Sequence, residues 1–444
     1  MRSFRAVLVL TLTLSAAACA TAGRSPADGV ARLERSRAAR PNDGAVARSL
    51  GIAYYKAARY DDARKQLDAA VKLAPRDGAA ALYLGLTAEQ QKDIPAARAA
   101  YQGYVLHGRT SRVRRQLEAR LAALTRQELA VSAKAAVAQE QQLSGATASP
   151  RVVAVMPLRF VGNDSTLQPL ERGFAELLTT DLSRSSQLTV VERARLQALL
   201  DEIKLQQSGA TDAATNVRAG KIIQAGRIVS GQIMQSEQRL RVDAAIVNTT
   251  TSQVAGGAAN ENTLEQLLEI EKNIVLQLFD SLGVVLTTVE RNAIEQRPTR
   301  SMQAFLAYSQ GLQLEDQGRY ADAASRFQDA ARIDPGFVQA SQRGAQAQAA
   351  AVGMQLSPAT IESNLTGTAE GNVAEKAAQG DASQNGGGTE NSASNIVENI
   401  NESPAGTATS GASGGKPGSK DPVSEGVGAD SRKSGTFRII VRVP

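Results

Sequence analysis

The chain has 444 residues, of which 42% are hydrophobic and 21% charged, and 50 basic against 44 acidic side chains give a formal charge of +6. At about 150 residues per domain, this length predicts about three folding units. A single cysteine and a single histidine exclude an intrachain disulfide and argue against a His/Cys zinc cage or a Ser-His-Asp triad. The balanced charge is unlike the basic footprint of a nucleic-acid-binding protein, so we expect no nucleic-acid partner. We also expect no metal and no cofactor.

Residues 1–18 have the layout of a secretory signal peptide. Arg2 and Arg5 form a short basic segment, an apolar run at 6–14 follows, and small residues then precede Cys19. The apolar run is too short to span a bilayer as a helix. The sequence therefore predicts export and removal of the signal.

Cys19 is the only cysteine of the protein, and residues 16–19 resemble the lipobox of bacterial lipoprotein signals, with Ala16 where Leu is usual. The resemblance implies that Cys19 is acylated and becomes the first residue of the mature protein. Because Ala20 follows instead of an Asp, it also implies sorting to the outer membrane. The alternative is ordinary cleavage near the alanine run, with Cys19 incidental. Residues 19–40 are expected to form a tether.

Small and aromatic residues recur at a spacing of 34 residues, and a third copy of the pattern lies far downstream. The pattern resembles the tetratricopeptide repeat, in which small residues allow two amphipathic helices to pack closely and a proline ends the second helix. The signature positions are Gly51, Tyr54, Ala63, Ala70 and Pro75 in the first copy, Gly85 and Ala97 in the second, and Gly311, Ala323, Phe327, Ala330 and Pro335 in the third.

These copies divide the helical part of the chain into two segments. Residues 41–145 are expected to hold two repeats and a long helix, and residues 286–353 the third repeat with flanking helices. Because fewer than three stacked repeats rarely bury enough surface to stand alone, we expect the third copy to be capped by its flanks or to dock onto the first pair. Such repeats either present a groove to a partner segment or space domains apart, and the sequence leaves both alternatives open.

Residues 150–285 have a different pattern. The apolar, β-branched run at 152–156 ends at Pro157 and predicts a buried strand. Farther on, a strand at 228–234 followed by alternating apolar residues at 240–246 predicts a hairpin. Leucines at helical spacing complete the order β-α-β-α-α-β-β-β-α, which predicts an α/β domain with a mixed sheet and helices packed on it.

Several stretches of this domain resemble the curli-assembly CsgG family. The motif positions are Pro157, Glu192 and Arg193, followed by the run Gln206, Gln207, Ser208 and Gly209. The family usually has Gly-Ala where this chain has Gln224-Ala225. The resemblance implies a bacterial outer-membrane lipoprotein that acts as an oligomeric export channel, an activator or a scaffold.

Channel members of that family insert extra hairpins that assemble into a transmembrane barrel. Such a hairpin needs about 20 additional residues, because each membrane-spanning strand takes about 9–11 residues. The longest gaps between the predicted elements, at 159–166 and 206–211, are too short for one. We therefore expect a CsgG-like fold without membrane-spanning hairpins.

The carboxylates of this domain are not expected to be catalytic, because acid–base chemistry needs two of them paired in a pocket. We expect solvated helix faces and caps for five of them: Glu171, Asp181, Glu192, Asp201 and Glu202. His107 is expected to lie at a helix end, and Gly256-Gly257 lacks the lysine and the helix of a phosphate-binding loop. The sequence therefore predicts no enzyme activity.

Residues 366–434 contain no aromatic residue and are rich in Gly, Ser, Asn and Thr, which predicts a disordered tail. Residues 435–444 differ from this tail, because apolar and basic residues alternate there. The apolar row is Phe437, Ile439, Val441 and Val443, and the basic residues are Arg438 and Arg442. This alternation predicts a β-strand that completes the chain's own sheet or adds to a partner's sheet. The alternative is a frayed terminus.

Together these features predict a lipid-anchored periplasmic scaffold or assembly factor at the outer membrane, which works through protein–protein contacts. Its expected partners are the membrane, through the lipid anchor, and other envelope or secreted proteins, and homo-oligomerisation is left open. Two alternative functions also stay open. One is an oligomeric component of a curli-type secretion channel, and the other is an activator of a periplasmic cell-envelope enzyme.

Overall fold

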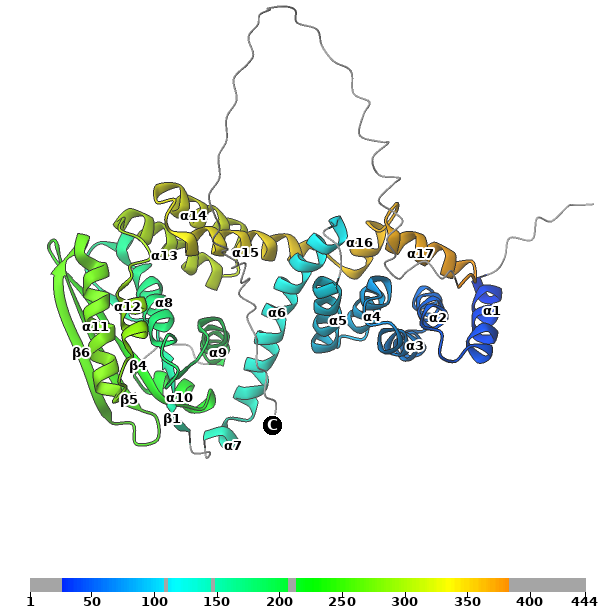
Figure 1. Ribbon diagram of the computed structural model, residues 1–444. Coiled ribbons are helices and arrows are strands. Elements are labelled where there is room, and N and C mark those ends of the chain that lie inside the picture. The colour runs from blue at the N-terminus through cyan, green and yellow to red at the C-terminus, as the bar shows by residue number, and fades with distance from the viewer. Residues whose placement is uncertain (1–25, 108–110, 145–147, 207–212, 383–444) are drawn as a thin grey trace, which may run out of the picture. The chain divides into compact units, whose positions relative to one another are not determined.

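The computed structural model describes residues 26–107, 111–144, 148–206 and 213–382 (Figure 1). Cys19, three of the motif residues (Gln207, Ser208 and Gly209) and the expected strand at 435–444 lie outside these ranges. Within them, no helix has both the length and the apolar character needed to cross a membrane.

The first part of the described chain is helical. Its elements are α1 (Pro26–Ala39), α2 (Gly44–Lys56), α3 (Tyr60–Leu73), α4 (Gly78–Gln90), α5 (Ile94–His107), α6 (Arg112–Ala138) and α7 (Glu140–Ser144). Aspartates start the first helices of the first two repeats, because their carboxylates accept bonds from otherwise unpaired backbone N–H groups. Asp43 does so for Ala45 and Val46 in α2, and Asp77 for Ala80 in α4.

The expected tether is wrong for residues 26–39, which form α1. Val30 and Leu33 lie one helical turn apart, and Leu33 is fully buried in the core of the first two repeats. The Tyr54 hydroxyl donates a hydrogen bond to Glu34 Oε1 at 2.7 Å. Apolar burial and this hydrogen bond therefore extend the helical array by one helix toward the N-terminus.

Glycines of the repeat signature lie where the two helices of each repeat cross. A Cβ atom built at Gly51 would lie 2.6 Å from Leu67 Cγ, and one at Gly311 would lie 2.6 Å from the Phe327 ring. The equivalent atom at Gly85 would overlap the Tyr101 ring. All three copies thus use a glycine to admit a large side chain of the second helix, as the repeat pattern predicts.

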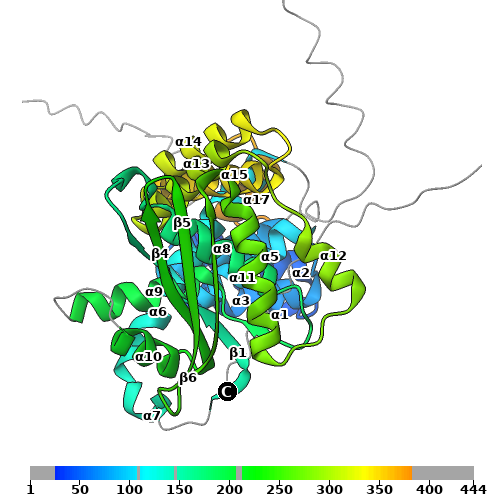
Figure 2. The same cartoon turned by 90° about the vertical axis from the view of Figure 1, so that its left-hand side faces the viewer.

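The middle part forms one mixed sheet. Its strands are β1 (Ser149–Val155), β2 (Arg159–Val161), β3 (Thr189–Val190), β4 (Ala225–Ser236), β5 (Arg239–Asn248) and β6 (Val254–Thr263). The strand order is β3-β1-β4-β5-β6, and β2 also pairs with β4. β1 is parallel to β3 and β4, whereas β4, β5 and β6 form an antiparallel meander, and Figure 2 shows these three strands side by side. The predicted hairpin and mixed sheet are confirmed.

Helices cover both faces of the sheet. They are α8 (Leu170–Leu182), α9 (Arg193–Gln206), α10 (Ala213–Ile222) and α11 (Leu267–Leu282), with short 3₁₀ turns at Ser165–Leu167 and Leu264–Gln266. Val153 and Val155 of β1 share a core with α8 and α11, whereas Ala154 and Met156 share a core with α9, α10 and the end of α6. This division follows from the two-residue period of a strand that is buried on both faces.

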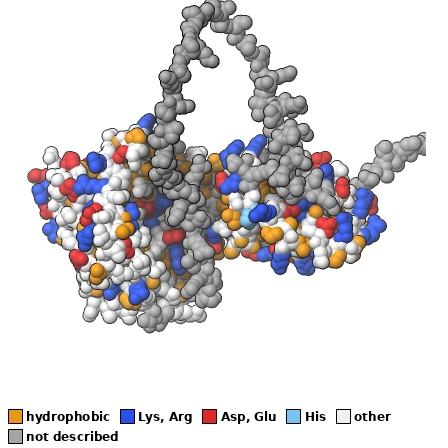
Figure 3. Space-filling model, viewed as in Figure 1, with side chains coloured by type: hydrophobic (Ala, Val, Ile, Leu, Met, Phe, Trp, Pro, Cys, Tyr) orange, Lys and Arg blue, Asp and Glu red, His pale blue; other side chains and the backbone are white. Residues whose placement is uncertain are grey.

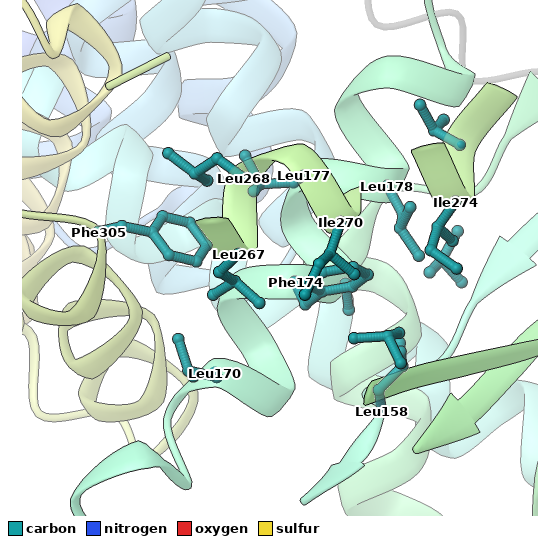
Figure 4. Close-up of a cluster of buried hydrophobic side chains, with 14 of the residues drawn as sticks. Leu158, Leu170, Phe174, Leu177, Leu178, Leu267, Leu268, Ile270, Ile274 and Phe305 are labelled. Atoms are coloured by element: carbon teal, nitrogen blue, oxygen red, sulfur yellow. The ribbon is translucent and has the colours of Figure 1, made fainter. Parts of the chain in front are cut away.

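The third repeat packs on the sheet domain. It consists of α13 (Met302–Asp316) and α14 (Tyr320–Ile333), preceded by α12 (Thr288–Glu295) and followed by α15 (Val338–Gln355). α13 packs against α8, and Figure 4 shows Phe305 of α13 beside Leu267 and Leu268 of α11. α15 packs along α6, where Gly353 allows close approach to the Ala119 carbonyl group. The array is thus completed through α6 and α15, and the sheet domain covers the other end of the third repeat.

The expected disordered tail is wrong for its first part, because α17 (Ala369–Ala378) follows α16 (Pro358–Ser363). The Thr368 hydroxyl accepts a bond from the Gly371 N–H and starts α17. Val373 and Ala377 lie one turn apart and are buried against the first repeats. A short apolar stripe with a good N-cap is therefore sufficient for order here.

Candidate functional site

The concave face of the first two repeats is formed by α2 and α4, the first helices of the two copies. α16 and α17 of the same chain lie across this face, and α17 contacts α1, α2 and α4 (Figure 1). Apolar side chains of the two helices and of the turn between them join the repeat core; they are Ile361, Leu365, Val373, Ala374 and Ala377. The face on which a tetratricopeptide array binds helical or extended segments is therefore already occupied by a helix of this chain.

Polar contacts fix α16 and α17 on this face at both ends. The Tyr104 hydroxyl donates to Glu370 Oε1 at 2.8 Å, and Lys56 Nζ lies 3.0 Å from Glu362 Oε1. Burial, followed by the Glu370 charge, raises the pKa of Tyr104 well above its ordinary value, so this phenol stays protonated and can donate. A buried ion pair also joins α2 to the start of α4, since Arg48 Nη1 lies 2.6 Å from Asp77 Oδ2.

A second cluster of polar side chains lies at the junction between the sheet and the third repeat. We call it the junction network: the arginines are Arg126, Arg172, Arg193 and Arg343, and the carboxylates are Glu176, Glu315 and Asp316. Arg193, at the start of α9, lies at its centre. Its guanidinium contacts Glu176 at 2.9 Å and Glu315 at 3.3 Å and also pairs with Asp316.

The remaining arginines approach the same carboxylates from other helices. Arg172 Nε of α8 lies 3.0 Å from Asp316 Oδ2, and Arg343 Nε of α15 lies 3.2 Å from Glu315 Oε2. Arg126 of α6 also pairs with Glu315. Four helices of the sheet domain and the array thus converge on the two carboxylates at the end of α13.

The surface has a different character from these buried clusters. On the face drawn in Figure 3, basic and acidic side chains are interspersed over both the sheet domain and the repeats. A mixed surface of this kind creates no extended field of one sign.

Two regions of the chain match known protein families. Residues 132–262 match the family described as curli production assembly/transport component CsgG, and residues 48–111 match a tetratricopeptide repeat family. The chain carries a CsgG-like domain together with tetratricopeptide repeats. The two matches indicate an envelope protein with an assembly or protein-interaction role. A search of curated proteins gives no significant match.

Two solved structures align with part of the chain. The C-terminal domain of LpoB from Salmonella enterica aligns at a TM-score of 0.21 with 15% identity, covering 29% of this chain and 94% of that chain. The same domain from Escherichia coli aligns at 0.22 with 14% identity, covering 28% of this chain and 95% of that chain. TM-scores this low support no conclusion about the fold or function of this protein.

The described motif residues of the CsgG-like domain do not form one common site. Pro157 and Arg193 line one small cavity together with Asp316 of the third repeat. Glu192 is exposed, and Gln206 is the last residue of α9. The sequence identifies Arg193 as a family residue but does not indicate its link to the third repeat, because its partners there, Glu315 and Asp316, lie more than 100 residues away.

Most signature residues of the repeats lie in the repeat cores, whereas the two prolines are exposed. The alanines at the five signature positions are fully buried: Ala63, Ala70, Ala97, Ala323 and Ala330. Pro75 and Pro335 each lie two residues beyond the last residue of a second helix. These residues shape the array and do not line a pocket with chemical function.

One of the five carboxylates expected on solvated helix faces is buried, so that prediction is wrong for Asp181. Its carboxylate pairs with Lys272 of α11 and lies 2.9 Å from Arg184 Nε. Glu271 is fully buried beside them, at 3.1 Å from Lys272 Nζ. Burial and the Asp181 charge raise the pKa of Glu271 to about 8, against the opposing effect of Lys272. The sequence signal that was missed is that apolar residues flank Glu271 and Lys272 on both sides within the helix expected at 264–282.

The other carboxylates have ordinary structural roles. Glu171 Oε1 accepts from the Phe160 N–H at 2.9 Å, and Gln197 Nε2 donates to Asp201 Oδ1 at 2.7 Å. Burial raises the pKa of Asp201. Glu202 is half-buried on α9, and His107 is the exposed last residue of α5.

A cavity of about 250 Å³ lies beside the buried Asp181 cluster. Asp181, Lys272 and Tyr308 line it, but the fully buried Glu271 does not. The carboxyl group with the most perturbed pKa therefore has no access to a substrate in this cavity. Among the described residues, no three His, Cys, Asp or Glu side chains are placed to hold a metal ion.

Replacing Glu271 by Gln is a pH test of this buried cluster. Since the pKa of Glu271 rises from 4.5 in the unfolded chain to about 8 in the fold, its contribution to stability is complete below pH 4.5 and is lost as pH rises toward 8. Gln resembles the protonated carboxyl group. We expect E271Q to flatten the fall in unfolding free energy between about pH 5 and about pH 8, measured by denaturant titration at several pH values.

Glu269→Gln on the same helix is the matched control, because Glu269 is half-exposed and pairs with Arg297. This variant is expected to keep the wild-type pH slope. An E271Q protein whose slope equals that of the wild type contradicts the assignment.

Proposed function

We propose that this protein is a lipid-anchored scaffold or assembly factor of the bacterial outer membrane, which binds helical segments of envelope or secreted proteins on the concave face of its first two repeats. The observation that carries the proposal is the helix α17 seated on that face. A face that accommodates an amphipathic helix of its own chain has the shape and chemistry to bind another.

The chemistry of α16 and α17 defines the partner. The groove receives small apolar side chains from α17, Val373, Ala374 and Ala377, with acidic residues placed opposite Tyr104 and Lys56. A partner helix with leucine or phenylalanine at the apolar positions buries more apolar area, at about 25 cal/mol per Å². Such a helix, with a glutamate one turn before its apolar stripe, is the partner expected to displace α17.

We also propose that the CsgG-like domain does not catalyse a reaction. The buried ionisable groups of the CsgG-like domain have protein partners, as the contacts of Asp181 and Arg193 illustrate. Fixed ion pairs of this kind orient helices, and Glu271, the carboxyl group whose pKa is raised most, does not line the neighbouring cavity. Contacts between proteins therefore account for the function better than catalysis does.

Changing Cys19 to Ala tests the anchor. Without the thiol that receives the lipid, the protein is expected to move from the outer-membrane fraction to the soluble periplasmic fraction and to lose incorporation of radioactive palmitate. Membrane fractionation and labelling of cells expressing either form measure both effects. Unchanged membrane association of C19A contradicts the lipid anchor.

Val373→Asp tests the groove. An aspartate at this buried position makes docking of α17 unfavourable, because its charge would have to leave water. A fluorescent peptide of residues 357–382 is expected to bind V373D at least 10-fold more tightly than it binds the wild type, measured by fluorescence anisotropy. Glu375→Ala on the exposed side of the same helix is the control and is expected to behave like the wild type.

The same variants report on partners in the cell envelope. A photo-crosslinking amino acid at Lys56, beside the groove, is expected to capture envelope proteins more strongly in V373D than in the wild type. The same group at the exposed Lys72 of α3 is expected to show no such increase. Crosslinks from Lys56 that stay within the chain in both forms contradict partner binding in the groove.

A further inference from the structure

The cavity beside Asp181, of about 250 Å³, lies where the CsgG-like domain meets the third repeat. Residues of α8 and α11 line one side of it, among them Leu177 of α8, which is labelled in Figure 4. The other side is formed by residues 296–298, by Tyr308 of α13 and by residues 336–339 at the start of α15. These elements are distinct from α2 and α4, so binding here is independent of the concave face of the first two repeats.

Tyr308 brings to this cavity a hydrogen-bond donor that the protein itself does not use. Tyr308 is 4% exposed, and its ring packs against Phe327 and Phe337 at centroid distances of 5.2 and 4.9 Å. Among the described residues, no group accepts a hydrogen bond from its hydroxyl. Burial raises the pKa of Tyr308 well above its ordinary value, so the phenol stays protonated and can donate. Because buried hydroxyl groups normally have a partner, this donor indicates an acceptor that enters the cavity.

Positive charge predominates around the cavity once the ion pairs are considered. The Asp181 carboxylate meets two cations, because it pairs with Lys272 and lies 2.9 Å from Arg184 Nε. Burial raises the pKa of Glu271, which also contacts Lys272, to about 8, so it carries little negative charge at neutral pH. Glu176 also lines the cavity, but its carboxylate is already paired in the junction network. An anion in the cavity therefore meets a surplus of cations, and both carboxylates of the lining are already paired.

Two arginines at the cavity keep N–H donors for a ligand. A guanidinium group has five such donors. Arg184 Nε donates to Asp181 Oδ1, and Arg297 Nη2 donates to Glu269 Oε1 at 2.8 Å. The two arginine side chains are 33% and 42% exposed, so their remaining donors are accessible to a ligand. A carboxylate can accept two parallel N–H bonds from such a group.

Much of the remaining lining is apolar, and it adjoins the start of a helix. Leu177, Pro298 and Phe337 belong to it, and Val338 is 56% exposed beside them. Phe337 is the N-cap of α15, and its side chain has no acceptor for the first N–H groups of the helix. The positive end of the α15 dipole therefore lies next to an apolar surface. The cavity thus combines donors for one anionic group with room for an apolar one.

We propose that this cavity binds a small carboxylate with an apolar body, such as a free arylalkanoic acid or the C-terminal residue of a partner chain. The carboxylate accepts hydrogen bonds from the Tyr308 hydroxyl and from one of the two arginines. The apolar body covers Leu177 and Val338 and removes their surface from water. Because the lining comes from both the CsgG-like domain and the third repeat, the bound ligand stabilises the contact between them.

The free acid 3-phenylpropionate and its amide test the chemistry of the site. In a ligand-detected NMR titration of the full-length chain, the acid is expected to bind saturably with a Kd of about 1 mM or lower. The amide has the same shape but no charge, and it is expected to bind at least about 10-fold more weakly. The peptide acetyl-Ala-Ala-Phe distinguishes the two sources of the carboxylate. It binds more tightly than 3-phenylpropionate if a chain terminus is the ligand, and more weakly if a free acid is.

Tyr308→Phe tests whether the binding takes place in the cavity. The change removes a hydroxyl that has no partner among the described residues, so the denaturation midpoint is expected to stay unchanged while the Kd for 3-phenylpropionate rises about 10-fold. Tyr320→Phe on α14, outside the cavity, is the matched control and is expected to bind like the wild type. The proposal is overturned if neither 3-phenylpropionate nor the peptide binds, if the acid and the amide bind equally, or if Y308F binds as tightly as the wild type.

Discussion

The guanidinium group of Arg193 lies between the CsgG-like domain and the third repeat, and the placement of the two folds depends on it. Its side chain is 9% exposed, and the carboxylates of Glu315 and Asp316 that it meets are each 4% exposed. Taking such charges out of water costs several kcal/mol for each ion, and the cost is offset only when the partners are in place. The apolar contacts of Phe305 and its neighbours supply the attraction between the two parts, whereas the junction network selects one geometry for it.

The fixed junction has consequences for the remaining helices. Arg126 of α6 and Arg343 of α15 join the same carboxylates, so the long helix that follows the first two repeats is held against the helix that follows the third. Repeat arrays gain stability from contacts between neighbours, and here the split array is completed through α6 and α15. The chain then continues into α16 and α17, which reach the concave face of the first pair. The groove and its occupant are thus positioned by the same contacts that join the two folds.

Much of the fold could be predicted because its signals are local. The glycines and alanines of the repeats, the apolar run before Pro157 and the alternation in β5 each depend on residues within one or two turns or strands. The failures share a different cause. Asp181 has the local pattern of a solvated carboxylate, and its buried partner Lys272 lies 91 residues away in the sequence. α17 has a capping threonine and a short apolar stripe, but its few apolar residues become ordered only by packing against α1, α2 and α4. A prediction made from the composition of the whole tail does not detect them.

Native-state hydrogen exchange of the wild type and of Arg193→Ala tests most directly whether the CsgG-like domain and the third repeat are one cooperative unit. The account predicts that amides of α8 and α13 open with the same free energy in the wild type. It also predicts that R193A lowers both values together by about 3–5 kcal/mol, because Glu315 and Asp316 lose a buried partner. If α13 opens at a lower free energy than α8 in the wild type, and R193A changes neither value, the two folds are independent and the central claim is wrong.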